Sequence, residues 1–83
     1  MRCFMHFDHC AGGFTVTFLA ENLRTPIGKR LNVRTLETLI AIARKLGGCE
    51  LEIGQMETDK DRWGRGSVWI NPSPEQCRFL GIK

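Results

Sequence analysis

The side chains best suited to chemistry gather near the start of the chain, where four zinc-type ligands fall within eight residues: Cys3, His6, His9 and Cys10. Zinc takes four sulfur or nitrogen ligands at tetrahedral corners, so the residue types fit a zinc site. The spacing does not fit, because structural sites usually draw two close ligands from one turn and two from a distant one. If residues 2–7 form a strand, Cys3 and His6 also point to opposite faces of it. We therefore predict no metal and interpret the four residues as core cysteines and surface histidines.

The remaining cysteines, Cys49 and Cys77, lie far along the chain. A zinc site that combines either of them with His6, His9 and Cys10 stays open as the alternative. The N-terminus lacks the long apolar region of a signal peptide, and no apolar run approaches the length of a membrane span. We therefore expect a cytoplasmic protein with reduced thiols, no membrane partner and no cofactor.

A second cluster lies in the charged loop at residues 58–66, where basic side chains surround a tryptophan: Lys60, Arg62, Trp63 and Arg65. Basic groups interleaved with an aromatic ring suit stacking on a nucleic-acid base or insertion into a protein pocket. The acidic neighbours Glu57, Asp59 and Asp61 offset much of the positive field, which favours a protein partner over a phosphate backbone. The alternative is that Trp63 folds back onto Phe79 or the sheet.

The same loop resembles the opening of an EF-hand calcium loop, with Asp59, Asp61 and Gly64 at its first, third and sixth positions. Trp63 stands where an oxygen ligand is needed, and Ile70 stands where the bidentate glutamate is needed. We therefore predict no calcium site here and interpret the loop as a hairpin tip in solvent.

Catalytic motifs are absent from the sequence. It has no P-loop, dinucleotide-binding fingerprint, nucleophile elbow or serine-containing triad order. Cys10 beside His9 offers a nucleophile and a base, but side chains of adjacent residues in a strand or turn diverge. A reactive thiol also needs an electropositive, partly exposed setting. We predict that the protein is not an enzyme.

The elements that must position these side chains follow from the spacing of apolar residues. Residues 35–48 predict the main helix, with Thr35 as N-cap and Gly47-Gly48 as the stop. A capping box that begins at Ser73 predicts a short helix over 74–80. Alternation of apolar and polar residues predicts strands over five ranges: 2–7, 14–21, 27–33, 49–56 and 66–72.

These elements predict an α+β fold in one domain over residues 1–83. We expect an antiparallel sheet of about five strands (β-β-β-α-β-β-α), with one main helix packed on one face and a short C-terminal helix at the edge. The inward-facing positions predict this core: Phe14, Val16, Phe18, Leu31, Leu39, Ile40, Ala43, Leu46, Leu51, Ile53 and Val68.

The outer face of this sheet is the second candidate for binding. It is expected to carry a mixed set of side chains: Phe4, His6, Thr15, Thr17, Leu19, Arg30 and Trp69. An antiparallel sheet can leave one face in water, which suits the threonines but not Phe4, Leu19 and Trp69. We therefore expect a homodimer or partner interface on this face, with Trp69 as an anchor and Trp63 nearby at one edge.

Composition sets the class of function. The 83 residues are 42% hydrophobic and carry 12 Lys and Arg against 9 Asp and Glu, a mild net charge of +3. Dedicated nucleic-acid binders of this size are usually more basic. In size and lack of catalytic groups the chain is similar in style to phage and plasmid proteins that obstruct host nucleic-acid machinery, such as anti-CRISPR inhibitors. This is an analogy of class.

We accordingly expect a small protein-binding inhibitor or adaptor that occludes a protein partner or a nucleoprotein complex. The alternative is a nucleic-acid-binding protein that uses the basic loop at 58–66 with Arg30 and Arg34.

Overall fold

Three strands joined by tight turns open the chain, and the later elements are laid against them. The computed structural model describes residues 2–58 and 64–82. The elements follow in the order β1 (Cys3–Cys10), β2 (Gly13–Leu19), β3 (Pro26–Val33), α1 (Leu36–Lys45), α2 (Glu50–Thr58), β4 (Arg65–Ile70) and α3 (Pro74–Leu80). The described strands form a four-stranded sheet in the order β3-β2-β1-β4, antiparallel throughout. The predicted α+β class is confirmed.

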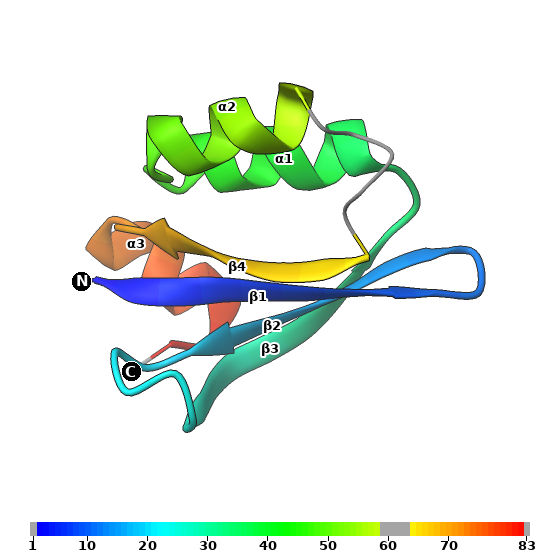
Figure 1. Cartoon of the computed structure of the whole chain (residues 1–83). Coiled ribbons are helices and arrows are strands. Elements are labelled where there is room, and N and C mark those ends of the chain that lie inside the picture. The colour runs from blue at the N-terminus through cyan, green and yellow to red at the C-terminus, as the bar shows by residue number, and fades with distance from the viewer. Residues whose placement is uncertain (1, 59–63, 83) are drawn as a thin grey trace.

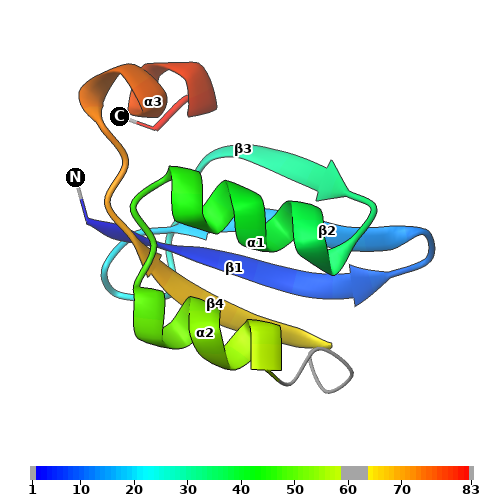
Figure 2. The same cartoon turned by 90° about the horizontal axis from the view of Figure 1, so that it is seen from above.

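The helices lie on one side of this sheet. Helices α1 and α2 run side by side above the strands in Figure 1. Seen from above, α1 and α2 cover the sheet and α3 lies apart, beyond one end of β3 (Figure 2). The opposite face of the sheet carries none of the described helices (Figure 1).

The turn between β1 and β2 needs glycine. Gly12 has φ +87° and Gly13 has φ +145°, values that other residues rarely adopt. A Cβ on Gly13 would also run into the backbone carbonyl of Val33 on β3. The glycine pair therefore allows the turn and also allows β3 to pass close to it.

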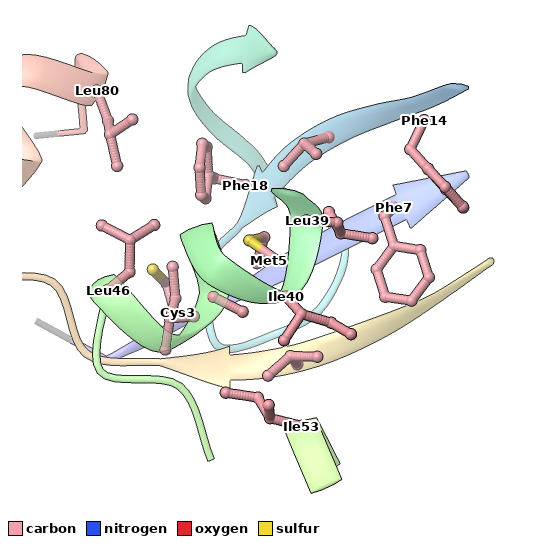
Figure 3. Close-up of a cluster of buried hydrophobic side chains, with 14 of the residues drawn as sticks. Cys3, Met5, Phe7, Phe14, Phe18, Leu39, Ile40, Leu46, Ile53 and Leu80 are labelled. Carbon is pink, nitrogen blue, oxygen red and sulfur yellow. The ribbon is translucent and has the colours of Figure 1, made fainter. Parts of the chain in front are cut away.

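The core fills the space between the sheet and the helices. Figure 3 shows side chains from the strands, such as Met5 and Phe18, pointing toward Leu39 and Ile40 of α1. Met5 and Phe18 are fully buried, as is Leu39. The predicted core is confirmed at most positions, although Leu31 is only half-buried. The core also takes in the inward side of β1, which carries Cys3, Met5 and Phe7.

The predicted strand over 49–56 is wrong, because this segment is the helix α2. The predicted five-stranded sheet therefore has four described strands. In so short a segment, the alternation of Leu51 and Ile53 with glutamates cannot be told from a helical pattern that buries Ile53 and Met56. Glutamates in the first turn suit the positive end of the helix dipole, and the segment is rich in good helix formers. Leu51 consequently points to solvent and is 73% exposed, against the prediction that it lies in the core.

Helix α2 and the residues before it cover the free edge of β4. The Trp69 N–H donates to Glu52 Oε1 at 3.1 Å, and the Cys49 N–H donates to the Trp69 carbonyl at 3.0 Å. The Asn71 N–H donates to the Leu46 carbonyl at 2.9 Å. An open strand edge is a template for pairing with another chain, so these bonds remove an aggregation hazard.

Both predicted N-caps are confirmed. The Thr35 hydroxyl accepts from the Thr38 N–H at the start of α1. At α3 the Ser73 hydroxyl accepts from the Gln76 N–H at 3.1 Å, while Gln76 Oε1 accepts from the Ser73 N–H at 2.8 Å. This reciprocal pair is the capping box that the sequence predicts.

The burial of α1 generates a matched pair of tests. We expect Leu39→Ala to lower the free energy of unfolding by about 2–5 kcal/mol, because it leaves a cavity at a fully buried site. Leu51→Ala, on the exposed side of α2, should change it by no more than about 0.5 kcal/mol. Urea unfolding followed by circular dichroism measures both, and equal effects would contradict the assigned helix faces.

Candidate functional site

The side chains of β1 that do not enter the core define an outer face of the sheet. Cys3, Met5 and Phe7 face the helices, so Phe4, with the other alternate residues of β1, faces away. The strand register places Phe4 opposite Leu19 of β2 and opposite Trp69 of β4. These three residues were predicted to share one face from the sequence, and the structure brings them together.

Trp69 is held by contacts on this face. Its ring centroid lies 3.5 Å from that of Phe4, with the planes tilted by 39°. The Arg2 guanidinium carbon lies 3.8 Å from the centre of the Trp69 ring, at cation–π distance. We call Arg2, Phe4, Leu19 and Trp69 the outer-face cluster.

The exposure of the outer-face cluster is uneven. Phe4 is only 6% exposed although it points away from the core. Trp69 and Leu19, its neighbours across the strands, are half-buried. Phe4 is therefore covered by its neighbours, and the solvent-accessible part of the cluster consists of Trp69, Leu19 and the exposed Arg2.

Polar side chains occupy the other half of the outer face. His6 Nδ1 lies 3.1 Å from Ser67 Oγ, and His6 Nε2 lies 3.0 Å from Asp8 Oδ2. The register makes this chain of hydrogen bonds, because His6 and Asp8 share a face of β1 and Ser67 lies opposite His6 on β4. The sequence suggests the His6–Asp8 pair through its spacing of two, but it does not identify Ser67, which follows only from the pairing of β1 with β4.

A serine, a histidine and an aspartate linked by hydrogen bonds are the residue types that many hydrolases use to activate a nucleophile. Such a reaction also needs N–H donors for the oxyanion. Strand β1 pairs with β2 on one side and β4 on the other, so its amides are taken up in the two ladders. The hydrogen bonds of His6 to Ser67 and Asp8 fix the orientation of these side chains on the outer face of the sheet.

Charge is distributed unequally between the two layers of the structure. The four described strands carry Lys29, Arg30 and Arg65 against one carboxylate, Asp8, which contacts His6. The three helices carry five glutamates against three basic residues. One of the three, Arg44, contacts Glu57 at 2.5 Å and Glu50 at 3.3 Å, and these bonds raise the pKa of its guanidinium. The strand layer is thus the more basic one.

The other predicted binding residues are placed as follows. Lys60, Arg62 and Trp63 lie outside the described residues. Arg65 begins β4, where it is exposed and paired opposite Asp8. Arg30 is exposed in the part of β3 that faces the irregular register between Val16 and Phe18. The sequence did not single out Arg2, although its alternation with Phe4 on β1 was a usable signal.

The candidate zinc ligands are dispersed over the sheet. Cys3 is fully buried in the core, where burial raises the pKa of its thiol and nearby Cys77 adds to the effect. Cys10 and His9 are exposed at the other end of β1. Among residues 2–58 and 64–82, no group of three or more His, Cys, Asp and Glu side chains could hold a metal ion.

Comparisons with models of protein families, with curated proteins and with solved structures found no significant match. In the described part of the chain, every helix is too short or too polar to cross a lipid bilayer.

We expect the purified protein to carry no stoichiometric metal, because Cys3 cannot meet His9 and Cys10 without unfolding β1. Elemental analysis of protein prepared without chelators measures this. One zinc per chain would contradict the prediction and favour a site around His9 and Cys10.

We also expect the cysteines to react at very different rates with a thiol reagent such as DTNB. Cys10 is exposed and should react first, while Cys3 and Cys77 are buried. The raised pKa of Cys3 lowers its thiolate fraction as well. Its reaction should be at least about a hundredfold slower than that of Cys10, since it requires an opening of the structure. Cys10→Ser removes the fast phase, and denatured protein, in which all the thiols are accessible, serves as the control.

Proposed function

We propose that this protein is a small non-enzymatic binding module that docks a protein partner on the outer-face cluster and acts by occluding that partner. The observation that carries the proposal is the half-buried Trp69, which contacts Phe4 and Arg2 on a sheet face that none of the described helices covers. Tryptophan and arginine are the residue types most enriched among those that dominate binding energies.

The arrangement of Trp69 favours tight binding at a small surface. The ring is fixed by Phe4 and by its own strand, so a partner orders few side chains when it docks. Leu19 extends the apolar area on one side, and the His6 network gives a polar rim on the other. An apolar centre with a polar rim is the usual composition of a protein interface.

We propose that the partner is cytoplasmic and belongs to nucleic-acid machinery. The protein would obstruct it in the way that phage or plasmid inhibitors of the anti-CRISPR type obstruct their targets. Support for it comes from the small size of the chain and the basic strand layer, which suits a nucleoprotein complex. The analogy is one of class.

Direct binding of single-stranded nucleic acid is the second candidate, and a specific observation favours it. Trp69 offers a stacking surface beside Arg2, and the strands carry Arg30 and Arg65 with Asp8 as their one carboxylate. Aromatic side chains with basic neighbours are a common platform for unpaired bases. The basic residues of the loop at 58–66 and Arg34 add further cations to the chain for contacts with phosphates.

The test of the primary proposal uses the tagged full-length chain in pull-downs from a lysate of its source cells, with and without nuclease. We expect a protein partner that survives nuclease treatment, and Trp69→Ala should weaken its binding by about thirtyfold, the equivalent of about 2 kcal/mol. Leu19→Ala should weaken it less. Leu51→Ala removes an equally apolar but distant exposed side chain and should leave binding unchanged. Normal partner binding by both outer-face variants would contradict the proposal.

The salt dependence of binding distinguishes nucleic-acid binding, the second candidate, from protein binding. If Arg2, Arg30 and Arg65 contact phosphates, affinity for a fluorescent oligonucleotide should fall about twentyfold between 50 and 200 mM salt. Protein docking through Trp69 should change much less over the same range. No binding of the oligonucleotide at the lower salt would exclude the second candidate.

A further inference from the structure

A second apolar surface lies on the helix side of the sheet, between α1, α3 and β3. It is a hollow of about 530 Å³. Nine residues line it: Leu31, Ile42, Lys45, Leu46, Ser73, Glu75, Gln76, Phe79 and Leu80. Figure 2 shows α3 apart from α1, beyond one end of β3. We call this hollow the α1–α3 groove.

The base of the groove is apolar, and a hydrogen bond connects α1 and α3 at one of its ends. Leu46 and Leu80 are buried at its base, and Leu31 and Ile42 are half-buried beside them. Gln76 Nε2 donates to the Lys45 carbonyl at 3.1 Å and so ties α3 to the end of α1. This hydrogen bond joins the two helices at one end of the groove.

Phe79 stands at the side of this groove and is 78% exposed. Helix α3 buries Cys77 and Leu80, so Phe79 falls on the side turned away from the core. Lys29 Nζ lies 5.7 Å from its ring centroid, and that distance leaves most of the ring open. Covering an exposed phenylalanine and an adjacent apolar hollow removes apolar surface from water and so lowers the free energy.

The rim of the groove carries one charge of each sign. Lys45 extends from the last turn of α1, and Glu75 lies in the first turn of α3. Neither side chain forms an ion pair with another described residue. An apolar projection, an apolar hollow and two opposite charges together make a surface that is complementary to itself.

We infer that a second copy of this chain occupies the α1–α3 groove in a two-fold symmetric dimer. Phe79 of each copy enters the groove of the other, and Lys45 of each copy faces Glu75 of the partner subunit. A two-fold axis makes every such contact twice, as in most homodimers. A partner whose surface carried only one sign of charge would place a like charge opposite Lys45 or Glu75. A purely apolar partner would bury both charged side chains without an opposite charge to pair with them.

The position of the groove gives this dimer a further property. The groove is lined mainly by residues of α1 and α3, whereas Phe4 and its neighbours in the outer-face cluster face away from the helices. Dimerisation therefore leaves both outer-face clusters free. Two linked sites can bind a repeated partner far more strongly than one site.

Sedimentation equilibrium of the full chain, over protein concentrations from about 1 µM to 1 mM, tests the inference. We expect a reversible dimer, and Phe79→Asp should raise its dissociation constant at least about thirtyfold, because the variant buries a charge in an apolar hollow. Leu51→Asp changes a similarly exposed apolar residue on α2 and should leave the constant unchanged. Circular dichroism confirms that each variant is folded.

Charge reversal identifies the second copy as the occupant. Lys45→Glu alone and Glu75→Lys alone should each weaken self-association, since each places like charges across the two-fold axis. An equimolar mixture of these two variants should restore dimers, because opposite charges then meet at both positions. A chain that stays monomeric throughout overturns the inference. So does a dimer that survives Phe79→Asp but is lost in Trp69→Ala, or a mixture that fails to recover.

Discussion

The structure depends on covering the inner side of β1. This strand lies in the interior of the sheet, between β2 and β4, and its residues Cys3, Met5 and Phe7 have no exposed surface. Burial of such side chains is the main favourable term in folding. A helix layer must therefore lie over this face, and α1 supplies Leu39, Ile40 and Ala43 for it. Because the described helices lie on one face of the sheet, none of them covers the other face.

The sheet edges are handled in different ways. At β4 the Trp69 N–H donates to Glu52 and the Trp69 carbonyl accepts from the Cys49 N–H. At β3, Gly28 has φ +70° and lies against the Leu80 carbonyl and Ile82. A Cβ at this position would clash with both, so the C-terminal residues can approach the strand only because the residue is glycine. Each edge is thus protected by a segment from a different part of the chain.

Local rules predicted much of this fold. The caps at Thr35 and Ser73, the period of α1 and the alternation in β1, β2 and β4 each depend on residues close in sequence, where the physical signal is strong. The segment 50–58 could not be assigned this way, since it reads equally as a strand or a helix and only the position of β4 decides. Packing against the rest of the fold made this segment a helix despite its alternation of apolar and polar residues.

The candidate surfaces were predictable to a smaller extent. Phe4, Leu19 and Trp69 could be assigned to one face because alternation alone places them there. That Phe4 lies beneath the other two depends on ring contacts that alternation does not describe. The α1–α3 groove depends on the placement of two helices that are far apart in sequence, and the Ser67–His6 contact joins residues 61 positions apart. Such features require the assembled chain.

The separation between β1 and β4 has a consequence for folding kinetics. The strands β1, β2 and β3 are consecutive hairpin partners, so they can pair early at a small cost in chain entropy. The pairing of β1 with β4 closes a much longer loop, and contacts of that kind form slowly. Phe4 and Trp69 meet only through this late pairing. We therefore expect partly folded chains that lack this pairing to lack the outer-face cluster, and a ligand that required the cluster would bind only chains whose sheet is complete.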